Sequence, residues 1–125
     1  MNWNKILLDT NIVLYLLSGD STLADFLRDK QIVIAFTTEL ELIGFSDTSV
    51  DEQEYISDFL RNAEVVKLNV EIKNIYARLR KEHRIKLGDA TIAASALFMN
   101  IPLMTADRLF SNIRELELVL YDKAS

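Results

Sequence analysis

The chain has 125 residues, enough for one domain with its own hydrophobic core and too few for two ordinary domains. Half of the residues are hydrophobic and 26% are charged, so the composition excludes a disordered, collagen-like or coiled-coil protein. Cysteine is absent, which excludes disulfide bonds, thiol catalysis and cysteine-ligated zinc, and the net charge of −5 argues against a uniformly basic nucleic-acid-binding surface.

Short apolar runs alternate along the chain with segments of helical periodicity. In chain order we expect a strand at 5–8, helices at 12–17 and 23–27, a strand at 31–36, a short helix at 42–45, a helix capped by Ser49, a strand at 64–68, a helix at 70–79, a helix at 90–99, and strands at 102–105 and 117–121. Strands separated by helices are connected by crossovers. The sequence therefore predicts an α/β fold over residues 1–125, a three-layer sandwich with about five mainly parallel strands and helices on both faces.

No part of the sequence predicts contact with a membrane. The longest apolar run, 12–17, is too short to span a bilayer. The apolar run near the start ends at Asp9, so we expect no signal peptide. These features predict a soluble, cytoplasmic protein.

Acidic side chains follow the ends of the expected strands. Asp9 follows the first strand, Glu39 and Glu41 follow the second, and Asp107 follows the fourth. Asp89 opens the alanine-rich helix after a loop. Ligands of open parallel sheets bind beyond the carboxyl ends of the strands, so we expect these acids to meet at one edge.

Helix capping is the alternative explanation for the same acids. The run from Thr38 to Glu41 matches a capping box, and Asp89 and Asp107 each precede a predicted helix, where aspartate is a good cap. Asp9 is the exception, because both residues after it are themselves good caps. The position of Asp9 therefore favours a role in a functional site over a role in helix capping.

A cluster of carboxylates needs protons or cations. Two carboxylates about 5 Å apart repel by roughly 3 kcal/mol at an effective dielectric constant near 20. His83 is the only histidine, so oxygen ligands dominate and Mg²⁺ is the expected ion, with Mn²⁺ as an alternative. Neutralising four acids would bring the net charge from −5 to about −1, which eases the approach of a polyanion.

Four motifs occur in order along the chain: Asp9-Thr-Asn-Ile12, Thr38-Glu-Leu-Glu41-Leu-Ile-Gly44, Leu87-Gly-Asp89-Ala-Thr-Ile-Ala-Ala94 and Thr105-Ala-Asp107-Arg-Leu-Phe110. Together they resemble the motifs of PIN-domain ribonucleases. In size the chain is most similar to VapC-type toxins of bacterial type II toxin–antitoxin pairs. The resemblance covers nearly the whole chain.

The resemblance implies a site and an activity. It assigns catalysis and metal binding to four acids, Asp9, Glu41, Asp89 and Asp107, with Asn11 and Thr105 as supporting hydrogen-bonding groups. Glu41 is preferred to Glu39 because the family places its acid three residues after the threonine. The implied activity is Mg²⁺-dependent endoribonuclease cleavage of RNA phosphodiester bonds. The implied partners are a second copy of the chain in a homodimer and a cognate antitoxin that holds the enzyme inactive.

A basic segment is the second feature of interest. Between Lys73 and Lys86 there are six basic residues and one acid. We expect Lys73, Arg80 and Arg84, at helical spacings of seven and four, to contact RNA phosphates. The alternative is a solvated helix face, and we expect His83 in the same segment to be a solvated surface histidine.

Two other functions compete with the nuclease prediction. A receiver-type signalling module would also have a doubly wound fold and an acidic Mg²⁺ pocket. It would need an aspartate at the end of the third strand, where the sequence has Lys67-Leu68-Asn69, and a pair of acids after the first strand, where only Asp9 occurs. A catalytically silent metal-binding module with the same fold is the second alternative, and the presence of all four acids gives no reason to prefer it.

Overall fold

A computed structural model describes residues 1–45 and 49–122 of the chain, and its core is one five-stranded sheet in the order β3-β2-β1-β4-β5. The strands are β1 (Lys5–Leu8), β2 (Gln31–Ala35), β3 (Glu64–Val66), β4 (Leu103–Thr105) and β5 (Leu118–Leu120). Every neighbouring pair is parallel, so all five carboxyl ends lie at one edge. The predicted strands and their parallel arrangement are confirmed.

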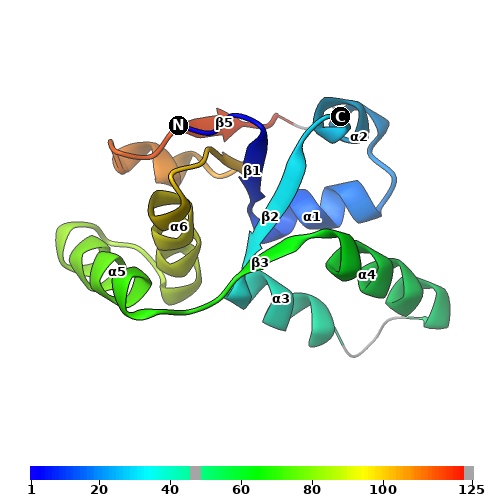
Figure 1. Cartoon of the computed structure of the whole chain (residues 1–125), viewed down its shortest axis with the longest axis horizontal. Coiled ribbons are helices and arrows are strands. Elements are labelled where there is room, and N and C mark those ends of the chain that lie inside the picture. Colours follow the sequence, from blue (N-terminus) through cyan, green and yellow to red (C-terminus); the bar gives the residue numbers. More distant parts are fainter. Residues whose placement is uncertain (46–48, 123–125) are drawn as a thin grey trace.

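Helices cover both faces of the sheet (Figure 1). They are α1 (Thr10–Leu17), α2 (Ser21–Leu27), α3 (Phe36–Ile43), α4 (Val50–Asn62), α5 (Val70–Glu82), α6 (Leu87–Met99) and the 3-10 helix η1 (Arg108–Asn112). Helices α5 and α6 stand on one side of the strands in Figure 1, and α1, α2 and α4 stand on the other. The predicted α/β three-layer sandwich is confirmed.

The alternation of side chains along the strands divides the core into two clusters. Leu7 of β1 packs with α5, α6 and η1, through residues such as Leu79 and Phe110. Its neighbours Ile6 and Leu8 point to the opposite face and pack with α1 and α2. Residues next to each other in a strand face opposite sides, so short strands that are apolar throughout fit a sheet covered on both faces.

The strand order places the reversal point of the sheet between β1 and β4. The chain runs outward from β1 to β2 and β3, and then crosses to β4 and β5 on the other side. Ligands of doubly wound folds bind at this point, beyond the carboxyl ends. Receiver modules have the order 2-1-3-4-5. The observed order therefore excludes the receiver alternative.

The observed ends of two helices change the roles expected for nearby residues. Helix α3 begins at Phe36, directly after β2, so Thr38 lies inside the helix. Helix α5 ends at Glu82, so Arg84 lies beyond it. The predicted helical spacing from Arg80 to Arg84 is therefore wrong.

Within the described residues, no helix combines the length and the apolar character that crossing a membrane requires.

Candidate active site

Asp9 lies at the carboxyl end of β1 and is only 7% exposed. Its backbone N–H donates to the Met104 carbonyl oxygen at 2.9 Å, which joins the ends of β1 and β4. Its carboxylate accepts two hydrogen bonds, from the Thr10 N–H to Oδ1 at 2.8 Å and from the Thr105 hydroxyl to Oδ2 at 2.7 Å. Asp9 is itself the N-cap of α1, so the expectation that a neighbour would cap the helix is wrong.

Thr105 connects Asp9 to Asp107. Its buried hydroxyl donates to Asp9 Oδ2 and accepts the Asp107 N–H at 3.0 Å. The Asp107 Oδ1 atom accepts the Leu109 N–H at 2.9 Å, so this acid caps η1, as the capping alternative predicted. Thr105 thus fixes the position of two of the four acids relative to each other.

Two threonines connect Glu41 to the same edge. The Thr10 hydroxyl donates to Glu41 Oε1 at 3.0 Å and lies 2.9 Å from the Thr38 hydroxyl. A hydroxyl has one proton, so Thr38 must be the donor in the second bond. The capping box is therefore wrong, because Thr38 is buried inside α3 and faces Thr10.

Asp89 lies in the first turn of α6, where Lys86 and not Asp89 is the N-cap residue. The capping alternative is therefore wrong for Asp89. The pKa of its carboxyl is raised, first by burial and then by the negative charges of Asp9 and Asp107, while Lys86 lowers it. These influences place Asp89 within electrostatic reach of the other acids.

The pKa of Asp9 is also raised. Burial is the largest cause, and the charges of Asp107 and Glu41 add to it. The hydrogen bonds from Thr105 and Thr10 favour the charged form and act in the opposite direction. The charges of neighbouring acids thus act on Asp9 and Asp89 at the reversal point of the sheet.

The acids fit a hard divalent cation through their chemistry and their mutual repulsion. Carboxylate oxygens are the ligands that Mg²⁺ and Mn²⁺ prefer, and a cation would remove the repulsion that raises these pKa values. No three of the four acids have ligand atoms within 4.8 Å of one another.

Residues 6–116 match the family model of the PIN domain. The chain belongs to the PIN domain family. The prediction made from the four motifs is confirmed, and no curated protein matches the sequence. Members of the family are nucleases.

Solved structures similar to this PIN domain come from toxin–antitoxin complexes. A chain of VapBC2 from Rickettsia felis, bound to a promoter DNA fragment, is 25% identical with a TM-score of 0.80, covering 94% of this chain and 99% of that one. A chain of VapBC-1 from nontypeable Haemophilus influenzae is 26% identical with a TM-score of 0.80, covering 93% and 97%. A toxin–antitoxin complex from Klebsiella pneumoniae also gives 26% and 0.80, covering 94% and 99%. Over nearly its whole length, this PIN domain is thus similar to chains of toxin–antitoxin complexes.

The sequence patterns did not predict that two threonines help to position the acids. They did predict a supporting role for Asn11, which stays a prediction. Thr10 and Thr38 make the bonds that hold Glu41, and both stand in the motifs that carried the family resemblance. Asn11, the predicted supporting residue, is exposed on α1 and takes no part in the bonds described above. Glu39 lies half-buried in the first turn of α3.

A cleft of about 500 Å³ adjoins the acids of the PIN domain. Asp89 and Asp107 form part of its lining. The other lining residues come from the end of α5, the loop to α6, and η1 with the residue after it: Glu82, His83, Arg84, Ile85, Lys86, Leu109, Phe110, Asn112 and Ile113. The His83 side chain is 23% exposed, so the expected solvated surface histidine is instead part of the cleft wall.

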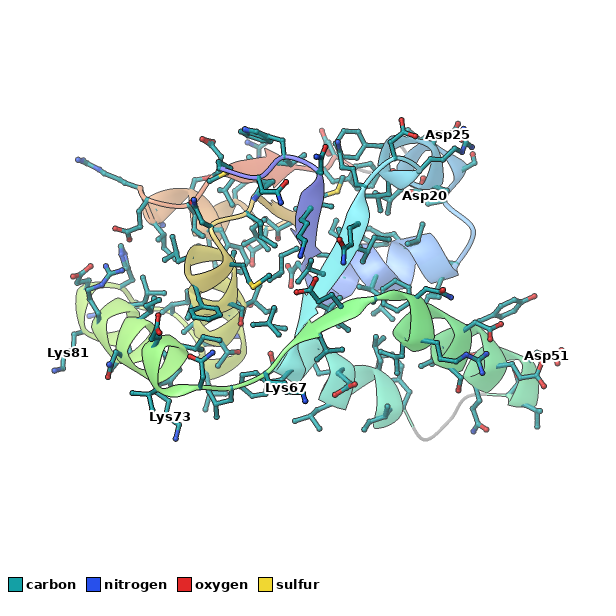
Figure 2. The ribbon with its side chains drawn as sticks, in the orientation of Figure 1. Asp20, Asp25, Asp51, Lys67, Lys73 and Lys81 are labelled. Atoms are coloured by element: carbon teal, nitrogen blue, oxygen red, sulfur yellow. The ribbon has the colours of Figure 1, made fainter. Side chains whose placement is uncertain are left out.

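The three predicted RNA-binding residues have different surroundings. Arg84 lines the cleft. Lys73 is exposed on α5 and points away from the body of the protein (Figure 2). Arg80 lies 5.7 Å from the centre of the Tyr76 ring and donates to its hydroxyl at 2.9 Å. Of the three, only Arg84 adjoins the acids.

A second group of potential metal ligands includes two residues of the cleft lining, Glu82 and His83. Atoms of Glu82, His83 and Glu115 lie within 4.8 Å of one another. Arg78 already serves these carboxylates, with Nη1 at 3.2 Å from Glu82 and 3.5 Å from Glu115. The group is therefore an ion-pair network on the surface.

Proposed function

We propose that the protein is a Mg²⁺-dependent endoribonuclease and the toxin of a type II toxin–antitoxin pair. The observation that carries the proposal is the meeting of Asp9, Glu41, Asp89 and Asp107 at the reversal point of a PIN-domain sheet, where burial and then the neighbouring charges raise the pKa values of Asp9 and Asp89. A nuclease needs positive charge beside the phosphate that it cleaves. A divalent cation bound by these acids would supply that charge.

Asp9, Asp89 and Asp107 would hold the ion, with Mn²⁺ as an alternative to Mg²⁺. A bound divalent ion supplies Lewis-acid stabilisation of charge on the phosphate and lowers the pKa of a nearby water molecule. The Thr105 hydroxyl donates to Asp9 at 2.7 Å, which favours the charged form of Asp9, and it accepts the N–H of Asp107. The first ligands are thereby fixed before the substrate arrives.

Glu41 differs from the other three acids because it is exposed. Its Oε1 atom is held by Thr10, so the carboxylate keeps its place at the rim of the site. From there it would complete the ligand set or orient the attacking water. In-line attack would give a 5′-phosphate and a 3′-hydroxyl.

RNA is the proposed substrate, and Lys73, Arg80 and Arg84 are proposed to contact its phosphates. Arg84 has the most direct place, since it lines the cleft beside Asp89 and Asp107. Neutralised acids would lift the net charge toward zero and remove the barrier to a polyanion.

A cognate antitoxin and a second copy of the chain are the proposed protein partners, in the cytoplasm. The similar solved structures are toxin–antitoxin complexes, which supports an antitoxin. Leu14 and Leu17 of α1 line a groove with the exposed Tyr55 of α4, and residues 13–17 are apolar nearly all round. An apolar surface of this kind fits a partner helix or strand.

An RNA cleavage assay tests the proposal. The wild type should cleave RNA in Mg²⁺ and lose activity in chelator, and Asp9→Asn should abolish cleavage. Asparagine is an equally good cap, so α1 keeps its N-terminus. Glu39→Gln is the matched control, since it removes one acid from α3 without touching the four, and it should keep full activity. Full cleavage by Asp9→Asn, or in chelator, contradicts the proposal.

A further inference from the structure

We propose that the cleft beside the acids receives one unstacked nucleobase of the RNA, next to the phosphate that is cleaved. The inference rests on the proposed nuclease function and adds to it a place where the substrate is read. It also assigns a function to Leu109 and Asn112.

The cleft and the acids form one continuous site. Asp89 and Asp107 belong to both, so a phosphate at the acids has its own nucleotide at the mouth of the cleft. The cleft volume of about 500 Å³ lies within the range of ligand pockets, roughly 300–1,000 Å³.

The apolar part of the cleft suits the face of a base. Leu109 is 67% exposed although it stands only two residues after Asp107. Ile85 and the buried Phe110 and Ile113 continue the apolar surface inward. A base has apolar faces and polar edges, so it would cover an exposed leucine that a bare phosphate would leave in water.

The polar part of the cleft suits the edge of a base and the phosphates on either side. Asn112 is exposed and its amide offers both a donor and an acceptor, the combination that pairs with base edges. Arg84 and Lys86 add positive charge to the same lining. Both side chains share this lining with Asp89 and Asp107.

A base in this cleft must leave its stack. Bases in a duplex are held between their neighbours, and enzymes that bind one in a pocket use single strands or flip the base out. A base that binds in this cleft must therefore be unpaired in the bound RNA.

An abasic scan tests the proposal. A short single-stranded oligoribonucleotide with one mapped cleavage site is prepared as a series, each member lacking one base. One position beside the scissile bond should lower kcat/KM roughly ten- to hundredfold, the effect of losing a stacked base, and the others should change little. The same series is measured in Ca²⁺ by fluorescence anisotropy, which reads binding separately from cleavage.

Two variants connect that position to the cleft. Leu109→Ala and Asn112→Ala should each lower kcat/KM on the intact oligonucleotide, and each should reduce the penalty of the missing base. Mn²⁺ affinity should stay at the wild-type value, because neither side chain is an acid. Leu87→Ala is the control, since Leu87 is 58% exposed at the start of α6 and does not line the cleft.

A flat scan in both cleavage and binding overturns the inference. It is also overturned if both variants keep the full penalty at the sensitive position. A wild type that cleaves no RNA contradicts the proposed function instead, and the binding series then still decides whether the cleft holds a base.

Discussion

Asp9 has two functions that act in opposite directions on stability. Its Oδ1 atom caps α1, which stabilises the fold, while its buried charge is repelled by neighbouring acids. The bonds from Thr105 and Thr10 lower its pKa and so oppose this effect in part. An ionisable side chain whose charged form is destabilised by burial and by neighbouring charges is typical of a functional site.

Asp9→Asn should therefore be more stable than the wild type in the absence of divalent ions. The raised pKa means that the folded state keeps its proton more readily than the unfolded one. The wild type thus loses stability as the pH rises from about the ordinary carboxyl value of 3.8 through the raised folded pKa. The advantage of Asp9→Asn, measured as the difference in Tm, should grow over this window and then level off. Saturating Mn²⁺ should reverse the order, because only the wild type gains binding energy. A difference that is constant with pH contradicts this.

Thr105→Val should weaken Mn²⁺ binding roughly 10- to 100-fold, the usual effect of losing a group that orients a ligand. Valine fills the same volume but cannot donate to Asp9 Oδ2 or accept the Asp107 N–H. The pKa of Asp9, followed by carboxyl NMR, should rise, since the lost bond lowers it. Thr105→Ser keeps the hydroxyl and is the control. Equal affinity in both variants would show that the bond does not position the acids.

The sequence patterns predicted only part of this site. The four acids could be predicted because each stands in a motif. The bonds among Thr10, Thr38 and Glu41 could not, because they depend on where α3 begins. A shift of the helix start to Phe36 changes Thr38 from a cap into a buried partner.

The ends of the helices determine where several site residues lie. Helix α3 starts directly after β2 and has no side-chain cap. Its N-cap residue is Ala35, the last residue of β2, which still pairs with Val66 of β3. Tertiary pairing overrides the local capping pattern here. Helix α5 ends at Glu82, which puts Arg84 in the loop that lines the cleft. The apolar periodicity predicted that both helices exist but not where they end.

Asn100 ends α6 in the left-handed conformation, with φ of 53°. Asparagine tolerates this region better than other residues with a Cβ atom. Asn100→Ala should lower the free energy of unfolding by about 1 kcal/mol, as measured with denaturant. Asn100→Gly should keep it close to wild type or raise it slightly. A larger loss for glycine than for alanine would contradict a conformational cause.

The protein is acidic overall, but two basic side chains lie beside the acids of the candidate active site. The net charge is −5, yet Arg84 and Lys86 both line the cleft at Asp89 and Asp107. The sequence predicted the basic segment, but the fold separates its members. Lys73 points away from the body of the protein, and Arg78 forms ion pairs with Glu82 and Glu115.

Arg84→Gln should weaken RNA binding and reduce the slope of log K against log salt by about 0.7, the share of one phosphate contact with a single strand. Lys73→Gln removes the same charge from the outer side of α5 and should reduce the slope less. Fluorescence anisotropy at several salt concentrations compares the two. An equal reduction by both variants would show that the overall charge, and not the place of Arg84, determines binding.

The proposed activity requires that Asp9, Asp89 and Asp107, with Glu41 beside them, bind divalent metal together. Calorimetric titration of Mn²⁺ into the wild type and into single Asn or Gln variants tests it most directly. We predict saturable binding by the wild type and by Glu39→Gln, and loss of that binding in Asp9→Asn and Asp89→Asn. Unchanged Mn²⁺ binding in both aspartate variants would contradict the account.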